Sequence, residues 1–404
     1  MGKWTRRALI AAGSLVGGGL LLGVGGLAFA PNRWRIGRER AGAQGLNTWV
    51  AVTRDNRVLI QVPHCDIGQG AQSALAMMLA DELDADWNSV EVYEAPALPE
   101  LANGHLLTAF LPLKSLPGPL QRGYLYATYR LTRLGGFQVT GGSASVRATG
   151  QFGMRIAGAA AREMLLRAAA RRWRVDWRDC NARDSFVTHL PSGRRATFGE
   201  LAPLAASFAP PTRPRLKTRS ELRLVGTTQR RHDIPAKVDG SAIFGADVRV
   251  PQMLYAAIRA APAHGAVLLG CDPAPAQSML GVHRVVTLPN AVAVVADSWW
   301  RAQRAVERLQ PRFSEPAPDR RLDSAGLLAQ HSAALERLGP NRAVNGAAAG
   351  SVPAGAGGPV VRARYELPFL HHATIEPMNA TAQLRDGHLT VWTGVQDPLN
   401  AAHV

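Results

Sequence analysis

The chain has 404 residues, with 46 lysines and arginines against 30 aspartates and glutamates, so its formal net charge is +16. Hydrophobic residues make up 47% and charged residues 19%, which excludes an intrinsically disordered chain and leaves room for two or three domains. Three cysteines (Cys65, Cys180 and Cys271) form no Cys-x-x-Cys pair, so the sequence contains neither a disulfide framework nor an iron–sulfur motif.

The positive charge is almost entirely arginine, spread thinly along the chain. Nucleic-acid-binding proteins usually concentrate basic residues and interleave them with aromatic side chains. We therefore expect a solvated basic surface and no nucleic-acid partner.

Residues 1–30 have the pattern of a twin-arginine export signal, because Arg6 and Arg7 precede an uncharged apolar run over 8–30. Ala28-Phe29-Ala30 matches a cleavage site, although Pro31 follows it directly. The run is also long enough to span a bilayer, so a removed signal and an uncleaved anchor both remain open. Either interpretation predicts a location on the periplasmic side of the inner membrane.

In chain order, the first part of the sequence alternates strand and helix patterns. We expect strands over 49–52, 58–62 and 89–93, helices over 71–83 and 153–171, and between them a long loop with local helix over 95–136. A turn at 191–193, a short helix over 198–206 and a proline-rich connector ending at Lys217 complete this part.

The second part has the pattern of an α+β unit over 218–310. We expect strands over 241–248, 254–259, 283–288 and 291–295, and a helix over 299–309 with Asp297 and Ser298 as cap candidates. Alanine, glycine and proline then dominate 311–358, which predicts a flexible connector. Strands are expected over 360–366, 381–384 and 389–392, with Asp386-Gly387 as a turn.

Two glycine-containing loops precede helices and are candidate cofactor-binding sites. In the first, Gly68 and Gly70 allow close approach of a ligand to the backbone, and Gln69 can hydrogen-bond a polar cofactor edge. Free amides at the following helix N-terminus would favour an anion. In the second, Gly142, Ser143 and Ser145 could cradle a phosphate. The alternatives are an ordinary strand-to-helix turn and a flexible loop.

A third stretch contains His371, His372 and Glu376, whose types could suggest a metal site. Pro377 and the neighbouring strand patterns argue against a helix that would bring them together, so a buried or turn histidine is the better interpretation. We assign no metal ligand in this chain. Cys65 is interpreted as structural, and no Gly-x-Ser-x-Gly nucleophile elbow occurs.

Taken together, these stretches resemble the molybdopterin-binding large subunits of the xanthine dehydrogenase/aldehyde oxidase family. The nearest branch is the isoquinoline 1-oxidoreductase beta-subunit type. The resemblance rests on segments 66–70, 83–87, 142–146, 157–162, 231–242, 253–256, 292–297, 376–379 and 396–398. It covers nearly everything after about residue 47.

The resemblance implies an α+β, multi-domain subunit preceded by the signal or anchor at 1–30. Its parts would be a first molybdopterin-binding segment (45–215), an a/b hammerhead domain (218–310), the connector (311–358) and the start of a second molybdopterin-binding segment (359–404). Gly68, Gln69, Gly70, Gly142, Ser143, Ser145 and Gln396 would contact the cofactor, expected to be molybdopterin cytosine dinucleotide with molybdenum. The activity implied is hydroxylation of a carbon in an N-heterocycle or aldehyde, with electrons passed to 2Fe-2S clusters on a small ferredoxin-like partner subunit.

Two departures from the family pattern affect the functional interpretation. Ile67 stands where the family usually has methionine, which is a small change in volume. The family's glycine-rich loop and its C-terminal glycine–glutamate motif, which bears the general base, do not occur after Gln396. We therefore expect the N-terminal part of such a subunit, cut short by a gene truncation, a frameshift or a split gene, with the catalytic glutamate outside this chain. If the gene is split, a second polypeptide would carry the missing half. The alternatives are an inactive fragment, a membrane-anchored, non-enzymatic binding module, and a basic peripheral membrane protein.

Overall fold

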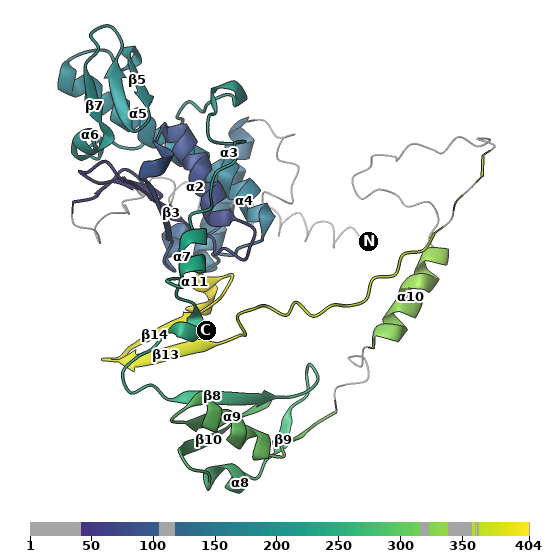
Figure 1. The fold of residues 1–404 in the computed structure, drawn as a ribbon. Coiled ribbons are helices and arrows are strands. Elements are labelled where there is room, and N and C mark those ends of the chain that lie inside the picture. Colours follow the sequence, from purple (N-terminus) through teal and green to yellow (C-terminus); the bar gives the residue numbers. More distant parts are fainter. Residues whose placement is uncertain are drawn as a thin grey trace, which may run out of the picture. The chain divides into compact units, whose positions relative to one another are not determined.

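The structure is a computed structural model that describes residues 42–104, 118–315, 323–337, 358–359, 361 and 363–403. Within these residues the chain forms two compact units. The first runs to Ile243 and also takes in residues 393–403, and the second is Phe244–Trp392. Both units combine helices and strands (Figure 1), which confirms the predicted α+β class. The predicted segment 1–30 lies outside the described residues.

The first unit is built on a four-stranded sheet in the order β1-β2-β3-β4. Its strands are β1 (Gln44–Gly45), β2 (Val50–Val52), β3 (Val58–Val62) and β4 (Val90–Glu94). The β2–β3 pair is an antiparallel hairpin, whereas β3 and β4 are parallel. A parallel pair requires a crossover connection, and helix α2 (Ala71–Leu83) provides it.

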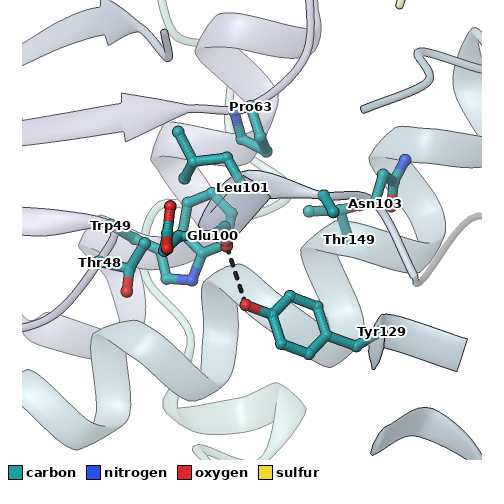
Figure 2. A pocket seen from close by; sticks show the side chains of 9 residues that line it. Thr48, Trp49, Pro63, Glu100, Leu101, Asn103, Tyr129 and Thr149 are labelled. Carbon is teal, nitrogen blue, oxygen red and sulfur yellow. Dashed lines mark hydrogen bonds between the residues drawn. The ribbon is translucent and has the colours of Figure 1, made fainter. Parts of the chain in front are cut away.

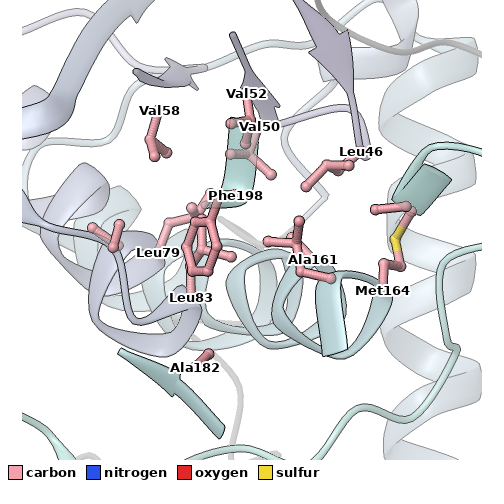
Figure 3. Close-up of a cluster of buried hydrophobic side chains, with 14 of the residues drawn as sticks. Leu46, Val50, Val52, Val58, Leu79, Leu83, Ala161, Met164, Ala182 and Phe198 are labelled. Atoms are coloured by element: carbon pink, nitrogen blue, oxygen red, sulfur yellow. The ribbon is translucent and has the colours of Figure 1, made fainter. Parts of the chain in front are cut away.

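A nearly continuous helical segment packs on α2. It consists of α4 (Ser143–Thr149), one π-helical turn (Gly150–Met154) and α5 (Arg155–Trp173). A side chain at Gly158 would overlap the Leu79 carbonyl oxygen, so the α2 and α5 backbones approach closely there. Figure 3 shows the core that results, in which the side chains labelled are Leu46, Val50, Val52, Val58, Leu79, Leu83, Ala161, Met164, Ala182 and Phe198.

A small second sheet completes this core. It contains β5 (Cys180–Arg183), β6 (Phe186–His189) and β7 (Arg195–Thr197) in that order, and leads into α6 (Phe198–Ala205). Thr197 and Glu200 form a capping box at the start of α6. The backbone N–H of Thr197 lowers the pKa of the Glu200 carboxyl, because it stabilises the charged form.

The connector after α6 is fixed to α2 by a buried ion cluster. The Lys217 ammonium lies 2.6 Å from Asp84 Oδ1 and 3.6 Å from Asp81 Oδ1. Glu82, which is fully buried, pairs with Arg155 at 2.5 Å. Because each of these charges has a partner, the cluster holds residues 215–225 against α2, and helix α7 (Ile234–Asp239) follows.

The second unit contains a three-stranded antiparallel sheet with β11 (Ala291–Ala296) between β10 (Val282–Leu288) and β8 (Tyr255–Ala260). Helix α9 (Trp299–Arg308) packs on it, and Ser298 caps this helix as predicted. Smaller elements are β9 (Leu268–Gly270), α8 (Ala274–Gln277), β12 (Arg312–Phe313), α10 (Ser324–Arg337), and the hairpin β13 (Ala380–Arg385) to β14 (His388–Thr393).

One local prediction was right only in part and two were wrong. The long loop with local helix expected over 95–136 contains a 17-residue helix, α3 (Gly118–Leu134), which is longer than the local helix expected. The expected strand over 241–248 is a turn of 3₁₀ helix at Gly245–Asp247, because the Asp247 carboxylate accepts the Phe244 amide. The described part of 360–366 forms no strand, since no neighbouring strand pairs with it there.

Helix α10 also lies inside the predicted connector over 311–358, where no helix was expected. Residues 218–243 belong to the first unit. The ion pairs of Lys217 and Arg223 with Asp84 attach this segment to that unit. No helix in the described part of the chain is both long and apolar enough to cross a bilayer.

Candidate functional site

The first glycine loop is organised by its own side chains. Gly68 and Gly70 adopt φ angles of 97° and 76°, which favour glycine. The Gln69 side chain turns back, so that its Oε1 accepts the Ile67 amide at 2.6 Å and its Nε2 donates to the Cys65 carbonyl at 3.1 Å. In this structure, therefore, the polar end of Gln69 is used within the loop.

The amides before α2 are not free, so that expectation was wrong. Asp66 Oδ1 accepts the amides of Gly68 at 2.9 Å and Gly70 at 3.4 Å, and Oδ2 accepts that of Gln72 at 3.4 Å. Arg231 lies 3.1 Å from the same carboxylate. An internal anion thus occupies the position that we expected for a ligand, and Arg231 balances its charge.

The second glycine loop has a different geometry. Gly142 adopts φ 55° and ψ −132°, a conformation that strongly favours glycine. Ser145 is buried, and its hydroxyl oxygen accepts the Gly141 amide at 2.6 Å. Ser143 is exposed at the first position of α4, so of the two predicted serines only its hydroxyl faces solvent.

Thr140 joins the predicted segments. Its amide donates to the Gln396 carbonyl at 2.6 Å, and its carbonyl accepts the Gln396 Nε2 at 2.9 Å. Its hydroxyl lies 3.2 Å from the Cys65 amide and 3.4 Å from His64 Nδ1. The structure therefore brings residues 64–70, 140–145 and 396 together, although 256 positions separate Thr140 from Gln396.

A buried polar network extends from this junction. His64 Nε2 lies 2.9 Å from the Thr149 hydroxyl, which in turn donates to Asn103 Oδ1 at 3.3 Å. Thr149 and Asn103 also line a cavity of about 120 Å³ (Figure 2), together with Thr48, Trp49, Pro63, Glu100, Leu101, Ala102 and Tyr129. The Tyr129 hydroxyl donates to the Glu100 carbonyl at 3.1 Å.

The two loops leave room for a ligand at the backbone. Among the described residues, and apart from the chain neighbours of each glycine, no atom lies within 4 Å of the position that a Cβ would take at Gly68, Gly70 or Gly142. Open backbone at three glycines of two joined loops lets a ligand approach the main chain there. The exposed Ser143 hydroxyl supplies a donor of the type that phosphates require, whereas the Gly141 amide already donates to Ser145. The donor set present thus fits a pterin dinucleotide better at the second loop than at the first.

The histidine candidates are not brought together with a third ligand. His371 and His372 are exposed, and Glu376 Oε1 accepts the Ala246 amide at 3.1 Å and the Asn379 amide group at 2.9 Å. Among the described residues no group of three or more His, Cys, Asp or Glu side chains is placed to hold a metal ion. Burial raises the pKa of the Cys65 thiol, which disfavours the reactive thiolate.

Sequence reasoning missed several residues that shape this region, notably His64, Asp66, Thr140 and Asp397. The Asp397 carboxylate accepts the Gln138 amide at 2.8 Å and caps α11 (Pro398–Ala401). Asp66 could have been found from its place two residues before Gly68, because aspartate often binds the amide two residues on. Nothing in the sequence pairs Thr140 with Gln396.

Comparison with known proteins gives three similar sequences. The isoquinoline 1-oxidoreductase beta chain of Brevundimonas diminuta is 32% identical over 393 residues, which is 87% of this chain and 47% of that protein. A nicotinate dehydrogenase subunit of Pseudomonas putida is 27% identical over 374 residues, which is 87% of this chain and 27% of that protein. The membrane-bound aldehyde dehydrogenase (pyrroloquinoline-quinone) of Gluconacetobacter polyoxogenes is 27% identical over 280 residues, which is 66% of this chain and 31% of that protein.

The chain spans about half or less of the length of these relatives. No family model matches it. Among solved structures, quinoline 2-oxidoreductase from Pseudomonas putida 86 aligns with 23% of this chain and 16% of its own, with TM-score 0.20 and 22% identity. The Cu,Mo-CO dehydrogenase aligns over the same shares with TM-score 0.20 and 19% identity. The sequence comparison confirms the predicted resemblance to the isoquinoline 1-oxidoreductase beta-subunit type.

Proposed function

We propose, from the premise that the chain is related over 87% of its length to the beta chain of an isoquinoline 1-oxidoreductase, that it forms part of a molybdenum hydroxylase. The observation that carries the proposal is the junction at Thr140, which joins both glycine loops to Gln396. These three segments come from distant parts of the sequence, and they are the ones that the resemblance assigned to the cofactor.

The cofactor that we propose is molybdopterin cytosine dinucleotide. Gly142, Ser143 and the amides of the second loop would hold its phosphates, and Gly68 and Gly70 would let the pterin approach the first loop. When bound, the molybdenum cofactor would supply oxygen transfer and accept two electrons. Gln396 would be positioned through its two hydrogen bonds to Thr140.

The reaction class that we propose replaces a carbon–hydrogen bond with a carbon–hydroxyl bond, with oxygen from water and the release of two protons and two electrons. Isoquinoline, nicotinate and aldehyde in the names of the relatives support an N-heterocycle or an aldehyde as substrate. No described residue is assigned as the general base, so the base would come from the part of the enzyme that corresponds to the other half of the relatives.

Two partner polypeptides follow from this proposal. One is the counterpart of the second half of the relatives, which would supply the base, and the other is a small ferredoxin-like subunit with 2Fe-2S clusters. The segment 244–310 would form most of an a/b hammerhead domain. A twin-arginine-type signal or anchor at 1–30 would place the assembly on the periplasmic side of the inner membrane; one relative is itself named as membrane-bound.

The test is pterin and molybdenum content after production in a host that makes the cofactor, together with a polypeptide equivalent to the second half of the relatives. We expect Gly142→Ala to lower the pterin content at least tenfold, because a Cβ strains the backbone of the second loop. Gly193→Ala is the matched control, since Gly193 also has a positive φ and open space but lies in a distant turn. Equal pterin content in both variants, or none in the parent protein, would contradict the proposal.

A second candidate function is a binding module that holds the ferredoxin-like subunit without a pterin. The first glycine loop favours this candidate, because the Gly68 and Gly70 amides already donate to Asp66 and are not open to a cofactor. Capture of a 2Fe-2S partner by protein that contains no pterin would support this candidate against the first.

A further inference from the structure

Helix α3 presents an apolar stripe to solvent. Leu120, Leu131 and Leu134 have exposed fractions of 62%, 53% and 74%. Gly123 and Ala127 lie between them on the same helical face, and Tyr124 borders it. The outer face of a helix on a soluble domain normally carries charged and polar residues, so this stripe is unusual.

The opposite side of α3 fixes the helix on the first unit, so the leucines cannot rotate inward. Thr128 and Thr132 are buried on that side. The Tyr129 hydroxyl donates to the Glu100 carbonyl at 3.1 Å, and Arg133 pairs with the Glu100 carboxylate at 3.0 Å. At the C-terminal end of the helix the Phe137 amide donates to the Thr132 carbonyl at 2.9 Å.

We propose that this face of α3 lies in the headgroup region of an anionic lipid bilayer. The stripe is the convex surface of one helix, which a bilayer can accept without a complementary groove. Arg130 borders it, and its side chain is partly exposed although its Nε atom is buried. An arginine at the edge of an apolar stripe can extend its charge to lipid phosphates.

Sequence and charge add to this argument. Phe137, with 43% exposure, lies just beyond the helix, and aromatic residues are enriched at bilayer interfaces. The net charge of +16 favours approach to an anionic surface. With 17 residues and a length of about 26 Å, and with Thr128 and Thr132 held by the protein, α3 lies on the bilayer and does not span it.

The experiment measures local depth in a bilayer on the full chain, after Cys65, Cys180 and Cys271 are replaced by alanine. A nitroxide label is attached to Leu131→Cys or, as the matched control, to Leu190→Cys, whose parent leucine is 65% exposed in the turn after β6. On addition of phosphatidylglycerol–phosphatidylcholine vesicles, we expect the label at 131 to gain collisions with oxygen and lose collisions with a water-soluble nickel complex. The label at 190 should stay accessible to nickel.

The label reports only the surroundings of residue 131. Attachment of the chain to vesicles through residues 8–30 would therefore not change the collision rates at this label. A label at 131 that is shielded from both reagents before vesicles are added would mean that protein covers the stripe, and would overturn the proposal. So would a label that remains accessible to nickel with vesicles, or equal depth on pure phosphatidylcholine. As a second variant, Leu131→Glu with Leu134→Glu should weaken binding to anionic vesicles, whereas Leu190→Glu should not. Failure of this proposal leaves the pterin measurement unaffected.

Discussion

Lys217 and Lys237 each place an ammonium 2.6 Å from an aspartate, but their surroundings differ. The Lys217 side chain is 7% exposed and faces Asp84, whereas Lys237 is 38% exposed and pairs with Asp233 one helical turn away. A buried charge that loses its partner stays desolvated, while an exposed one returns to water. The two ion pairs therefore contribute unequally to stability, although their nitrogen–oxygen distances are equal.

We expect Lys217→Met to lower the free energy of unfolding by about 3 kcal/mol, which is near the low end of the losses seen when a buried ion pair is broken. The loss is at the low end because Arg162 and Arg223 remain near Asp84. Lys237→Met should cost less than about 1 kcal/mol. Urea unfolding followed by circular dichroism measures both. Equal losses in the two variants would show that burial does not set the strength of these pairs.

His232 gives a prediction about pH. Burial lowers the pKa of its imidazole below 6.5, with a smaller opposing effect of Asp233. The unfolded chain then binds more protons below that pH, so this histidine makes stability rise with pH up to about 6.5 and lose that contribution as pH falls. We expect His232→Gln to reduce the increase in the urea midpoint between about pH 5 and about pH 7. An unchanged increase would contradict the assignment.

At the scale of residues, the sequence singled out the glycines of the two loops, although their backbone angles were not predicted. The positive φ angles at Gly68, Gly70 and Gly142 follow from glycine in loops before helices. The role of Asp66 was missed because its carboxylate and an external anion compete for the same backbone amides. The motif alone does not show which of the two anions binds those amides. The contact of Thr140 with Gln396 depends on tertiary folding and has no local signature.

At the scale of elements, the crossing of α2 and α5 depends on Gly158. A Cβ there would overlap the Leu79 carbonyl, which belongs to the backbone and cannot move without separating the helices. Gly123 in α3 is the natural comparison, because no atom lies within 4 Å of its Cβ position.

We expect Gly158→Ala to lower the free energy of unfolding by about 1–3 kcal/mol through overpacking. Gly123→Ala should raise it by up to about 1 kcal/mol, because alanine loses less backbone entropy in a helix. Thermal unfolding of both variants is the measurement. A stabilised Gly158→Ala variant would mean that the two helices can separate at no cost.

Elements with a clear period were predicted to within one or two residues, such as α2, β3, β11, α9 and the β13–β14 hairpin. Helix α3 was expected only as local helix within a loop, because Gly118, Pro119 and Gly123 weaken its helical pattern. The strand expected over 241–248 does not form, although the sequence pattern favoured it. The Asp247 carboxylate accepts a local hydrogen bond from the backbone, and this bond competes with pairing in a sheet.

At the scale of the whole molecule, the second unit contains an apolar segment without a core of its own. Tyr365, Leu367 and Ile375 have exposed fractions of 90%, 83% and 101%. The two-stranded β13–β14 hairpin that follows pairs with no third strand among the described residues. Such a hairpin is marginally stable alone, so we expect both to be covered by the counterpart of the second half of the relatives.

Amide hydrogen exchange tests this expectation. Residues 363–393 should exchange at least tenfold more slowly when that polypeptide is bound, because their amides become buried and paired. The β8–β11 pair is the internal reference and should not change. Equal exchange of 363–393 with and without the second polypeptide would show that these residues are not its contact.

The Asp66 carboxylate has one further consequence, which concerns competition. Because it is tethered two residues from the first amide that it binds, its effective concentration at that position is on the order of millimolar or higher. Free phosphate or sulfate that displaced it would remove the amide hydrogen bonds of Asp66 and place a second negative charge beside that carboxylate, so at ordinary levels it gains little. The loop therefore discriminates against small anions, and only a ligand that forms several contacts at once can open it.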